Sequence, residues 1–93
     1  MISARYKIVT NVMEKCERIT QKEECADAAA DLDLYGSWAE AWDGIEEIKG
    51  STNLIPYCWY NSKPGAAGGG LKYNTDSTAS KPCGRIYSCI CKQ

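Results

Sequence analysis

Six cysteines are the residues whose type and spacing carry the clearest chemistry in this chain. Their number is even and they are spread along the sequence, which predicts three structural disulfides. A zinc site would be built from Cys-x-x-Cys pairs, and the chain contains none. No metal site and no cofactor are therefore predicted. The six residues are Cys16, Cys25, Cys58, Cys83, Cys89 and Cys91.

The pairing of these cysteines is only partly constrained by the sequence. Cys89 and Cys91 flank one residue, so on a strand both sulfurs point to one face, where they are poorly placed to bond each other. Cys25, on a predicted helix, is expected to bond Cys58 or Cys91 on the sheet. Cys16 and Cys83 then take the remaining partners. Each bridge contributes roughly 2 to 4 kcal/mol, so we expect reduction to unfold the chain.

Catalysis is not predicted. The chain has no histidine, which removes the commonest general base and the usual partner of a nucleophilic Ser or Cys. Asp27, Asp31 and Asp33 lie close in sequence, but such a group on a helix is more often a solvated face than a calcium site. We predict a protein that is not an enzyme.

Chain length and charge limit the classes of function that remain. The chain has 93 residues, which is one domain spanning residues 1–93, and its formal net charge is -1, which cannot support nucleic-acid binding. The first 49 residues hold six basic and eleven acidic residues, and the rest hold five basic and one acidic. The simplest interpretation is that the halves attract each other within one fold. The alternative is a surface that docks on a second copy or a charged partner.

Localisation follows from the cysteines. Disulfides indicate an oxidising compartment: secreted, on a cell surface or in an organelle lumen. No apolar run reaches the roughly 18 residues that span a bilayer, and Met1–Met13 lacks the apolar core of a signal peptide. A secreted form is therefore expected to have had its targeting segment removed or replaced.

The expected fold class is α+β. A strand is predicted over Tyr6–Thr10, and Thr20-Gln21-Lys22-Glu23 has the pattern of a capping box that begins a helix. The apolar residues of this helix recur at helical spacing and form a narrow face, which allows the helix to lie close to a sheet. These residues are Cys25, Ala28, Ala29 and Leu32.

A second helix and a hairpin follow. Ser37-Trp38-Ala39-Glu40 is another capping box, and the apolar spacing predicts a helix that Gly50 ends. Two strands, Tyr57–Tyr60 and Leu71–Asn74, are predicted to flank a flexible glycine-rich loop, and Arg85–Lys92 is the last strand. The prediction is a small disulfide-rich domain with an antiparallel sheet of three to four short strands packed by one or two helices.

The order of these motifs resembles a cysteine-rich module that recurs, often in tandem, in extracytoplasmic proteins of unicellular algae and related protists. The resemblance covers nearly the whole chain and implies an extracytoplasmic, disulfide-bonded α+β module without an established activity. The chain departs from it at Lys15, Asp33 and Tyr57, each in place of a usual glycine. The matching elements are Tyr6-x-x-Val9, Cys16, Ile19-Thr20, Glu24-Cys25-x-x-Ala28-Ala29-x-x-Leu32-x-Leu34, Pro56-x-Cys58, Leu71-x-Tyr73-Asn74, Cys83 and Cys89-Ile90-Cys91.

Two functions remain, and both use aromatic residues. The first is a protein-interaction module, a small structural or accessory subunit of a larger or self-assembled extracytoplasmic complex. The alternative is a carbohydrate-binding module, in which aromatic rings stack on sugars while Asn61, Asn74 and Asp76 bond hydroxyl groups. Packing in the core is the competing role for all these rings. The candidate partner-binding residues are Trp38, Trp42, Tyr57, Trp59 and Tyr60.

Overall fold

The computed structural model describes residues 5–62 and 69–93. These residues form two helices and six strands, which confirms the predicted disulfide-rich α+β class. The predicted glycine-rich loop lies mostly outside the described residues. The elements in chain order are β1 (Tyr6–Val9), β2 (Glu17–Arg18), α1 (Lys22–Asp31), α2 (Trp38–Gly44), β3 (Glu46–Ile48), β4 (Tyr57–Asn61), β5 (Gly70–Asn74) and β6 (Tyr87–Lys92).

The sheet is larger than expected, and it is mixed. Its order is β1-β6-β4-β5-β3, and β2 pairs with β6 off this path. The predicted hairpin is confirmed, since β4 and β5 pair antiparallel with Cys58 opposite Tyr73. The β3–β5 pair is parallel, with Glu46 opposite Lys72, so the expectation of a purely antiparallel sheet is wrong at this edge.

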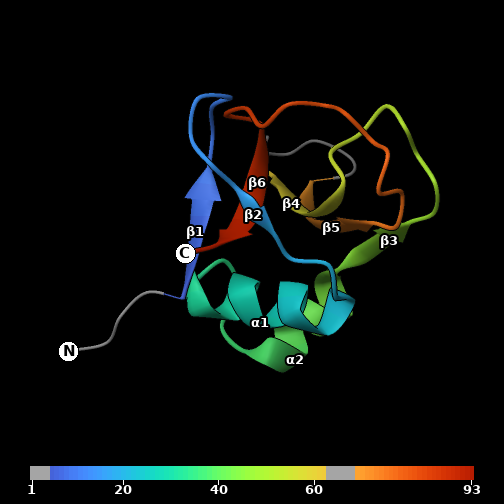
Figure 1. Cartoon of the computed structure of the whole chain (residues 1–93). Coiled ribbons are helices and arrows are strands. Elements are labelled where there is room, and N and C mark those ends of the chain that lie inside the picture. The colour runs from blue at the N-terminus through green and yellow to red at the C-terminus, as the bar shows by residue number, and fades with distance from the viewer. Residues whose placement is uncertain (1–4, 63–68) are drawn as a thin grey trace.

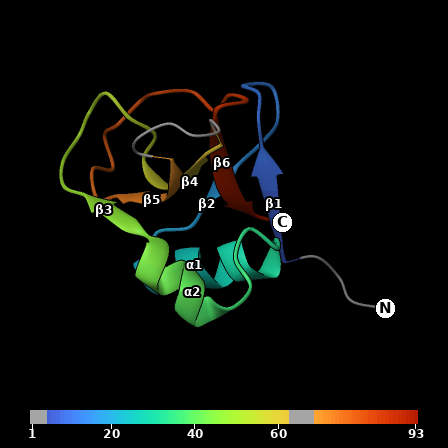
Figure 2. The same ribbon diagram turned by 180° about the vertical axis from the view of Figure 1, so that it is seen from behind.

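Both faces of the sheet are covered. The helices lie together against one face, with α2 outermost, and long connections gather on the opposite side (Figures 1 and 2). Cys58, Leu71 and Ile90 face the helices in one core, while Trp59 and Cys89 belong to a second core under the connections. Adjacent residues of one strand are consequently both buried. The alternation of buried and exposed residues expected for a sheet with one buried face does not hold here.

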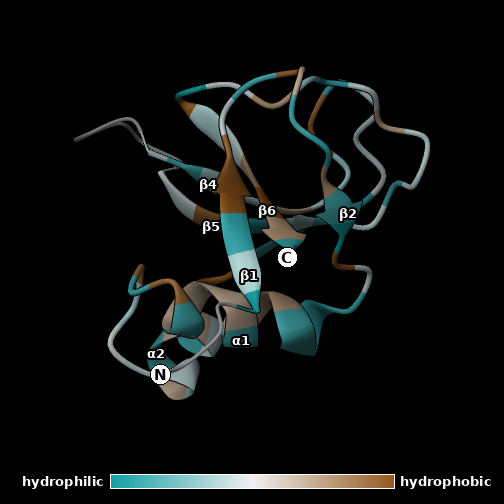
Figure 3. Ribbon diagram, turned by 60° about the vertical axis from the view of Figure 1, so that its left-hand side comes forward, coloured by the Kyte–Doolittle hydropathy of each residue, from teal (hydrophilic) through white to brown (hydrophobic). Residues whose placement is uncertain are grey.

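The exposed edge of the sheet at β1 is protected by charge. β1 is hydrophilic around its middle and hydrophobic at its end (Figure 3). Lys7 lies in this strand and pairs with Glu14 at 3.3 Å. A charged residue on an edge strand opposes pairing with other chains.

Helix α1 packs through small side chains, as predicted. Cys25, Ala28 and Ala29 are fully buried. The predicted capping box is wrong, because the N-cap is Gln21 and no side chain caps the helix. Thr20 instead contributes its backbone oxygen, which accepts a 2.7 Å hydrogen bond from the Tyr73 hydroxyl. This bond ties the start of α1 to the sheet.

Helix α2 begins as predicted and ends early. The Ser37 side chain accepts a hydrogen bond from the Glu40 backbone N–H at 3.2 Å, which confirms the side-chain cap predicted at Ser37. The helix stops at Gly44 rather than continuing to Gly50, and Ile45 is extended. Glycine is a poor helix former, and a Cβ at Gly44 would lie 2.9 Å from the Tyr35 ring. The following residues gain backbone bonds by pairing with β5.

Three disulfides cross-link the fold. Cys25–Cys58 joins α1 to β4, which is one of the two pairings expected for Cys25. Cys16–Cys91 joins the segment before β2 to β6. Cys83–Cys89 joins the segment that precedes β6 to β6 itself and closes a short loop. Cys89 and Cys91 do not bond each other, as predicted. These bridges indicate an oxidising environment.

Ion pairs join the acidic and basic halves of the chain. Lys72 pairs with Glu46, and Lys92 lies 3.9 Å from both Glu17 and Glu24. The Lys72 side chain is only 7% exposed, so its ammonium group requires this carboxylate. The opposite charges of the two halves therefore act, at least in part, within the fold.

Candidate functional site

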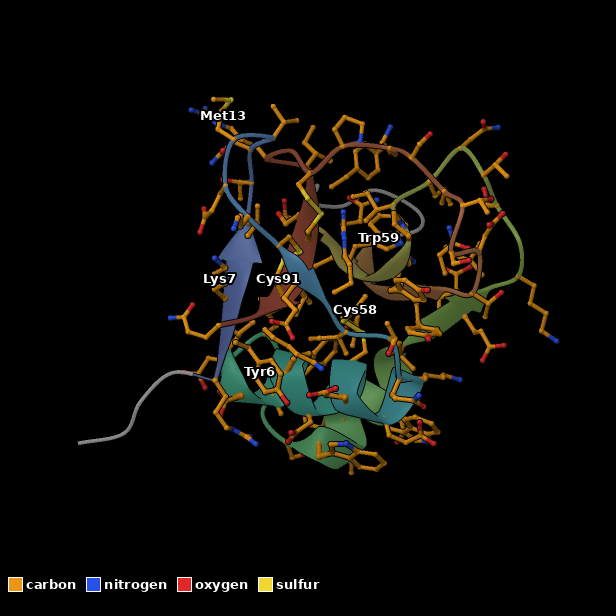
Figure 4. The ribbon with its side chains drawn as sticks, viewed as in Figure 1. Tyr6, Lys7, Met13, Cys58, Trp59 and Cys91 are labelled. Atoms are coloured by element: carbon orange, nitrogen blue, oxygen red, sulfur yellow. A yellow bond between two sulfur atoms is a disulfide. The ribbon has the colours of Figure 1, made fainter. Side chains whose placement is uncertain are left out.

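The aromatic residues of β4 belong to the interior. Trp59 is 2% exposed and packs in the core on the side of the sheet opposite the helices, whereas Cys58 points toward α1 (Figure 4). Tyr57 and Tyr60 are half-buried and pack against the helix-side core. The prediction that these three aromatic residues contact a partner is wrong for Trp59, because long connections cover the second face of the sheet. Tyr57 and Tyr60 contribute mainly to packing.

Trp38 and Trp42 form an aromatic pair on the outermost helix. Their ring centroids are 5.2 Å apart and the ring planes differ by 10°, so the indoles are stacked. Trp38 is 42% exposed, a large fraction for an indole, and Trp42 is half-buried. We define these two residues as the indole pair. The i, i+4 spacing on a helix explains how the sequence brings the rings together.

Specific contacts fix the orientation of the indole pair. The Trp38 Nε1–H donates to the backbone oxygen of Glu23 in α1 at 3.2 Å. The Lys22 ammonium lies 4.8 Å from the centre of the Trp42 ring and also pairs with Glu47 at 3.2 Å. These cation–π and ionic contacts help to fix the position of the Trp42 ring. Contacts within the chain therefore fix the orientation of both indole rings.

Tyr35 anchors the helix that bears the indole pair. Its hydroxyl accepts a hydrogen bond from the Leu71 backbone N–H at 3.2 Å, and its ring lies against Gly44 at the end of α2. One side chain thus connects α2 to β5. Helix α2 is thus held in place by packed elements, so its surface would lose little conformational entropy in a complex.

The helical layer around the indole pair is acidic. Between Lys22 and Lys49 the chain has nine carboxylates and no lysine or arginine. Several are neutralised from outside this segment, as Arg5 neutralises Asp27 at 3.3 Å. Glu40 and Asp43 on α2 have no ion-pair partner among the described residues. The exposed indole therefore sits on an element of negative charge.

A second exposed apolar feature was not predicted as a site. Val12 and Met13, between β1 and β2, are 69% and 88% exposed. Asn11 shapes this turn, because its Oδ1 accepts hydrogen bonds from the Met13 and Glu14 backbone N–H groups at 2.9 and 3.0 Å. Met13 lies at the end of the molecule away from the helices (Figure 4).

Two shallow hollows flank the segment that leads into β2. One, of about 370 Å³, is lined by Lys7, Lys15, Cys16, Glu17, Lys92 and Gln93. The other, of about 270 Å³, has Arg18 and Cys83 in its wall, together with Asn11, Val12, Glu14, Cys16 and Pro82. Burial lowers the pKa of Arg18, which has sulfur atoms as its polar neighbours. Among the described residues, no group of three or more side chains is arranged to hold a metal ion.

In the described ranges, two non-glycine residues have left-handed backbone conformations, Asp33 with φ 61° and Tyr57 with φ 62°. These are two of the three positions at which the sequence has another residue where the resemblance implies glycine. Lys15, the third departure, is not among the positive-φ residues. Left-handed backbone favours glycine because a Cβ is strained there.

Comparison with family models, curated proteins and solved structures gives no match. In the described part of the chain, no helix has the length and apolar character needed to cross a bilayer. The geometry of the site therefore supplies the argument for function.

Proposed function

We propose that the protein is a non-enzymatic, disulfide-stabilised interaction module that docks on a protein partner through the indole pair on α2. The observation that carries this proposal is the stacked, preoriented pair of Trp38 and Trp42, with Trp38 42% exposed. Tryptophan is enriched among the residues that dominate binding energy at protein interfaces. The module would serve as a small structural or accessory subunit of a larger assembly.

The charge of the helical layer suggests the character of the partner. Glu40 and Asp43 lie beside the aromatic residues on α2 without an ion-pair partner among the described residues. A complementary surface would offer an apolar recess for Trp38 and a basic rim for these carboxylates. Such complementarity mainly increases the association rate and the specificity of docking.

Two of the residues that supported the carbohydrate alternative are in the interior. Trp59 is buried, and Asn74 is fully buried, where it donates to the backbone oxygens of Ser51 and Ile55. Trp42 has Trp38 stacked on one face and Lys22 over its ring. Because the two indoles stack on each other, they cover part of each other's ring surface and leave a small platform for a polysaccharide. A protein partner fits the surface better.

The location that we propose is extracytoplasmic, either secreted, at the cell surface or in an organelle lumen. Three disulfides in a chain of this size support it. The resemblance to the cysteine-rich algal modules also supports it, since Asp33 and Tyr57 adopt positive φ where those modules usually have glycine. Neither observation names the partner.

An exchange experiment tests the proposal. Labelled, oxidised chain is mixed with the assembly purified from the native source, and its incorporation is followed by size-exclusion chromatography. Trp38→Ala should reduce incorporation at least tenfold, because an indole at an interface centre contributes about 2 kcal/mol or more. Met13→Ala, which removes an exposed apolar side chain far from α2, is the matched control. Equal incorporation of both variants would overturn the proposal, and polysaccharide binding that Trp38→Ala abolishes would favour the alternative.

A further inference from the structure

Arg18 places its guanidinium group against the Cys83–Cys89 disulfide. Its Nη1 lies 3.1 Å from Cys89 Sγ, and its Nη2 lies 4.0 Å from Cys83 Sγ. No carboxylate of the described residues pairs with Arg18. A partly buried cation whose polar contacts are disulfide sulfurs has little role in the oxidised state, but it would strongly favour a thiolate at the same place.

The two sulfurs of this bridge differ in access. Cys89 is fully buried, whereas Cys83 is half-buried and contributes to the wall of the 270 Å³ hollow that Arg18 also lines. An attacking thiolate can therefore approach Cys83 from solvent, with the guanidinium attracting its negative charge. The buried sulfur, which lies closest to Arg18, is then the leaving group.

The other two bridges lack this combination. Both sulfurs of Cys25–Cys58 are fully buried between α1 and β4. Cys16–Cys91 has one partly accessible sulfur, but no described cationic side chain donates to either of its sulfurs. The bridges also differ in loop length, with sequence separations of 75 for Cys16–Cys91, 33 for Cys25–Cys58 and 6 for Cys83–Cys89. A disulfide that closes a short loop stabilises the fold least, so reduction of Cys83–Cys89 should disturb the fold least.

We propose that Cys83–Cys89 is a redox-active disulfide that a dithiol reductant opens selectively, with Arg18 stabilising the departing Cys89 thiolate. Arg18 acts here as a positioning and charge-stabilising residue for thiol–disulfide exchange. The molecule would then hold two structural bridges and one exchangeable bridge.

The exchange balances as two successive displacements. One thiolate of the dithiol attacks Cys83 Sγ, the Cys83–Cys89 bond breaks, and its electron pair leaves on Cys89 beside Arg18. The second thiol of the dithiol, once deprotonated, attacks the reductant sulfur that is bonded to Cys83 in the mixed disulfide. This step releases Cys83 as a thiolate. The dithiol becomes a disulfide, two electrons pass to the protein, and the two cysteine sulfurs end as thiols or thiolates.

Selective reduction of the native chain tests the proposal. The oxidised protein is incubated with dithiothreitol in the absence of denaturant, quenched at intervals with an alkylating reagent, and digested for mass spectrometry. Cys83 and Cys89 should be alkylated first and together, at least tenfold faster than the other four cysteines, while circular dichroism retains the folded signal. Simultaneous labelling of all six cysteines, or earlier labelling of Cys16 and Cys91, would overturn the proposal.

Variants of Arg18 separate the charge effect from mere exposure. Arg18→Gln should slow alkylation at Cys83 and Cys89 about three- to tenfold, because the leaving thiolate loses its cation, and Arg18→Lys should recover part of the rate. Arg85→Gln, within the same short loop but without a contact to either sulfur, is the matched control and should leave the rate unchanged. If Arg18→Gln and Arg85→Gln react at the same rate as the parent chain, Arg18 has no such role. If Arg18→Gln does not fold, Arg18→Met, which keeps an unbranched side chain without the charge, takes its place, and a rate for Arg18→Met equal to the parent's would overturn the role of Arg18.

Discussion

Removing the three disulfides one at a time should destabilise the fold in the order of the chain length that each closes. The sequence separations are 75 for Cys16–Cys91, 33 for Cys25–Cys58 and 6 for Cys83–Cys89. If each bridge acts by restricting the unfolded chain, replacing both cysteines by alanine lowers the free energy of unfolding by about 4.5, 3.7 and 2.2 kcal/mol respectively.

The assay is urea unfolding of the oxidised variants, followed by circular dichroism without reductant. With a slope of about 1 kcal/mol per molar urea, a difference of about 2 kcal/mol between two variants separates their midpoints by about 2 M. The variant without Cys83–Cys89 should remain the most stable, and the variant without Cys16–Cys91 should be mostly unfolded before urea is added if the parent is marginally stable. Equal midpoints for these two variants would refute the loop-length argument.

Two further predictions concern single residues. Asp33→Val should lower the free energy of unfolding by about 1 to 2 kcal/mol, because a β-branched residue is strained at φ 61°, whereas Asp33→Gly should be neutral or slightly stabilising, and urea midpoints distinguish them. A similar loss for both variants would show that the carboxylate, and not the backbone, matters there. Burial, with hydrogen bonds to Glu24 and Asp27 at 3.0 and 3.2 Å, raises the pKa of Tyr6 well above its usual value of 10.0. The contribution of the Tyr6 hydroxyl to stability is therefore complete below pH 10. It is lost as the pH rises above 10, because Tyr6 ionises at a lower pH in the unfolded chain than in the folded protein. Tyr6→Phe should cost about 1 kcal/mol at pH 8 and reduce the decline between pH 10 and 11; an unchanged decline would assign it to other groups.

Local patterns predicted the parts of the fold that depend on neighbours in sequence. The Ser37 cap, the buried face of α1 and the β4–β5 hairpin follow from capping, helical spacing and strand composition. The end of α2 at Gly44 did not follow, because apolar spacing continues beyond it. Parallel pairing of β3 with β5, together with the Lys72–Glu46 ion pair, decides that boundary through contacts distant in the chain.

The candidate site was predicted in the same uneven way. Trp38 and Trp42 could be placed on one helix face from their spacing, but their stacking and exposure depend on where α2 lies. Trp59 of β4 was misassigned because the long connections that bury it on the second face of the sheet come from distant parts of the chain. The contact between Arg18 and Cys89 joins residues 71 positions apart, so no local pattern could reveal it.

The central claim, that Trp38 is buried against a protein partner, is tested most directly by hydroxyl-radical footprinting of the protein in its native assembly and as the isolated oxidised chain. We predict a native particle heavier than the 10.3 kDa chain, in which Trp38 is oxidised several-fold more slowly than in the isolated chain. Met13, which is 88% exposed and far from α2, should be oxidised at the same rate in both samples. A native mass of one chain, or equal oxidation of Trp38 in the particle and in isolation, would contradict the account.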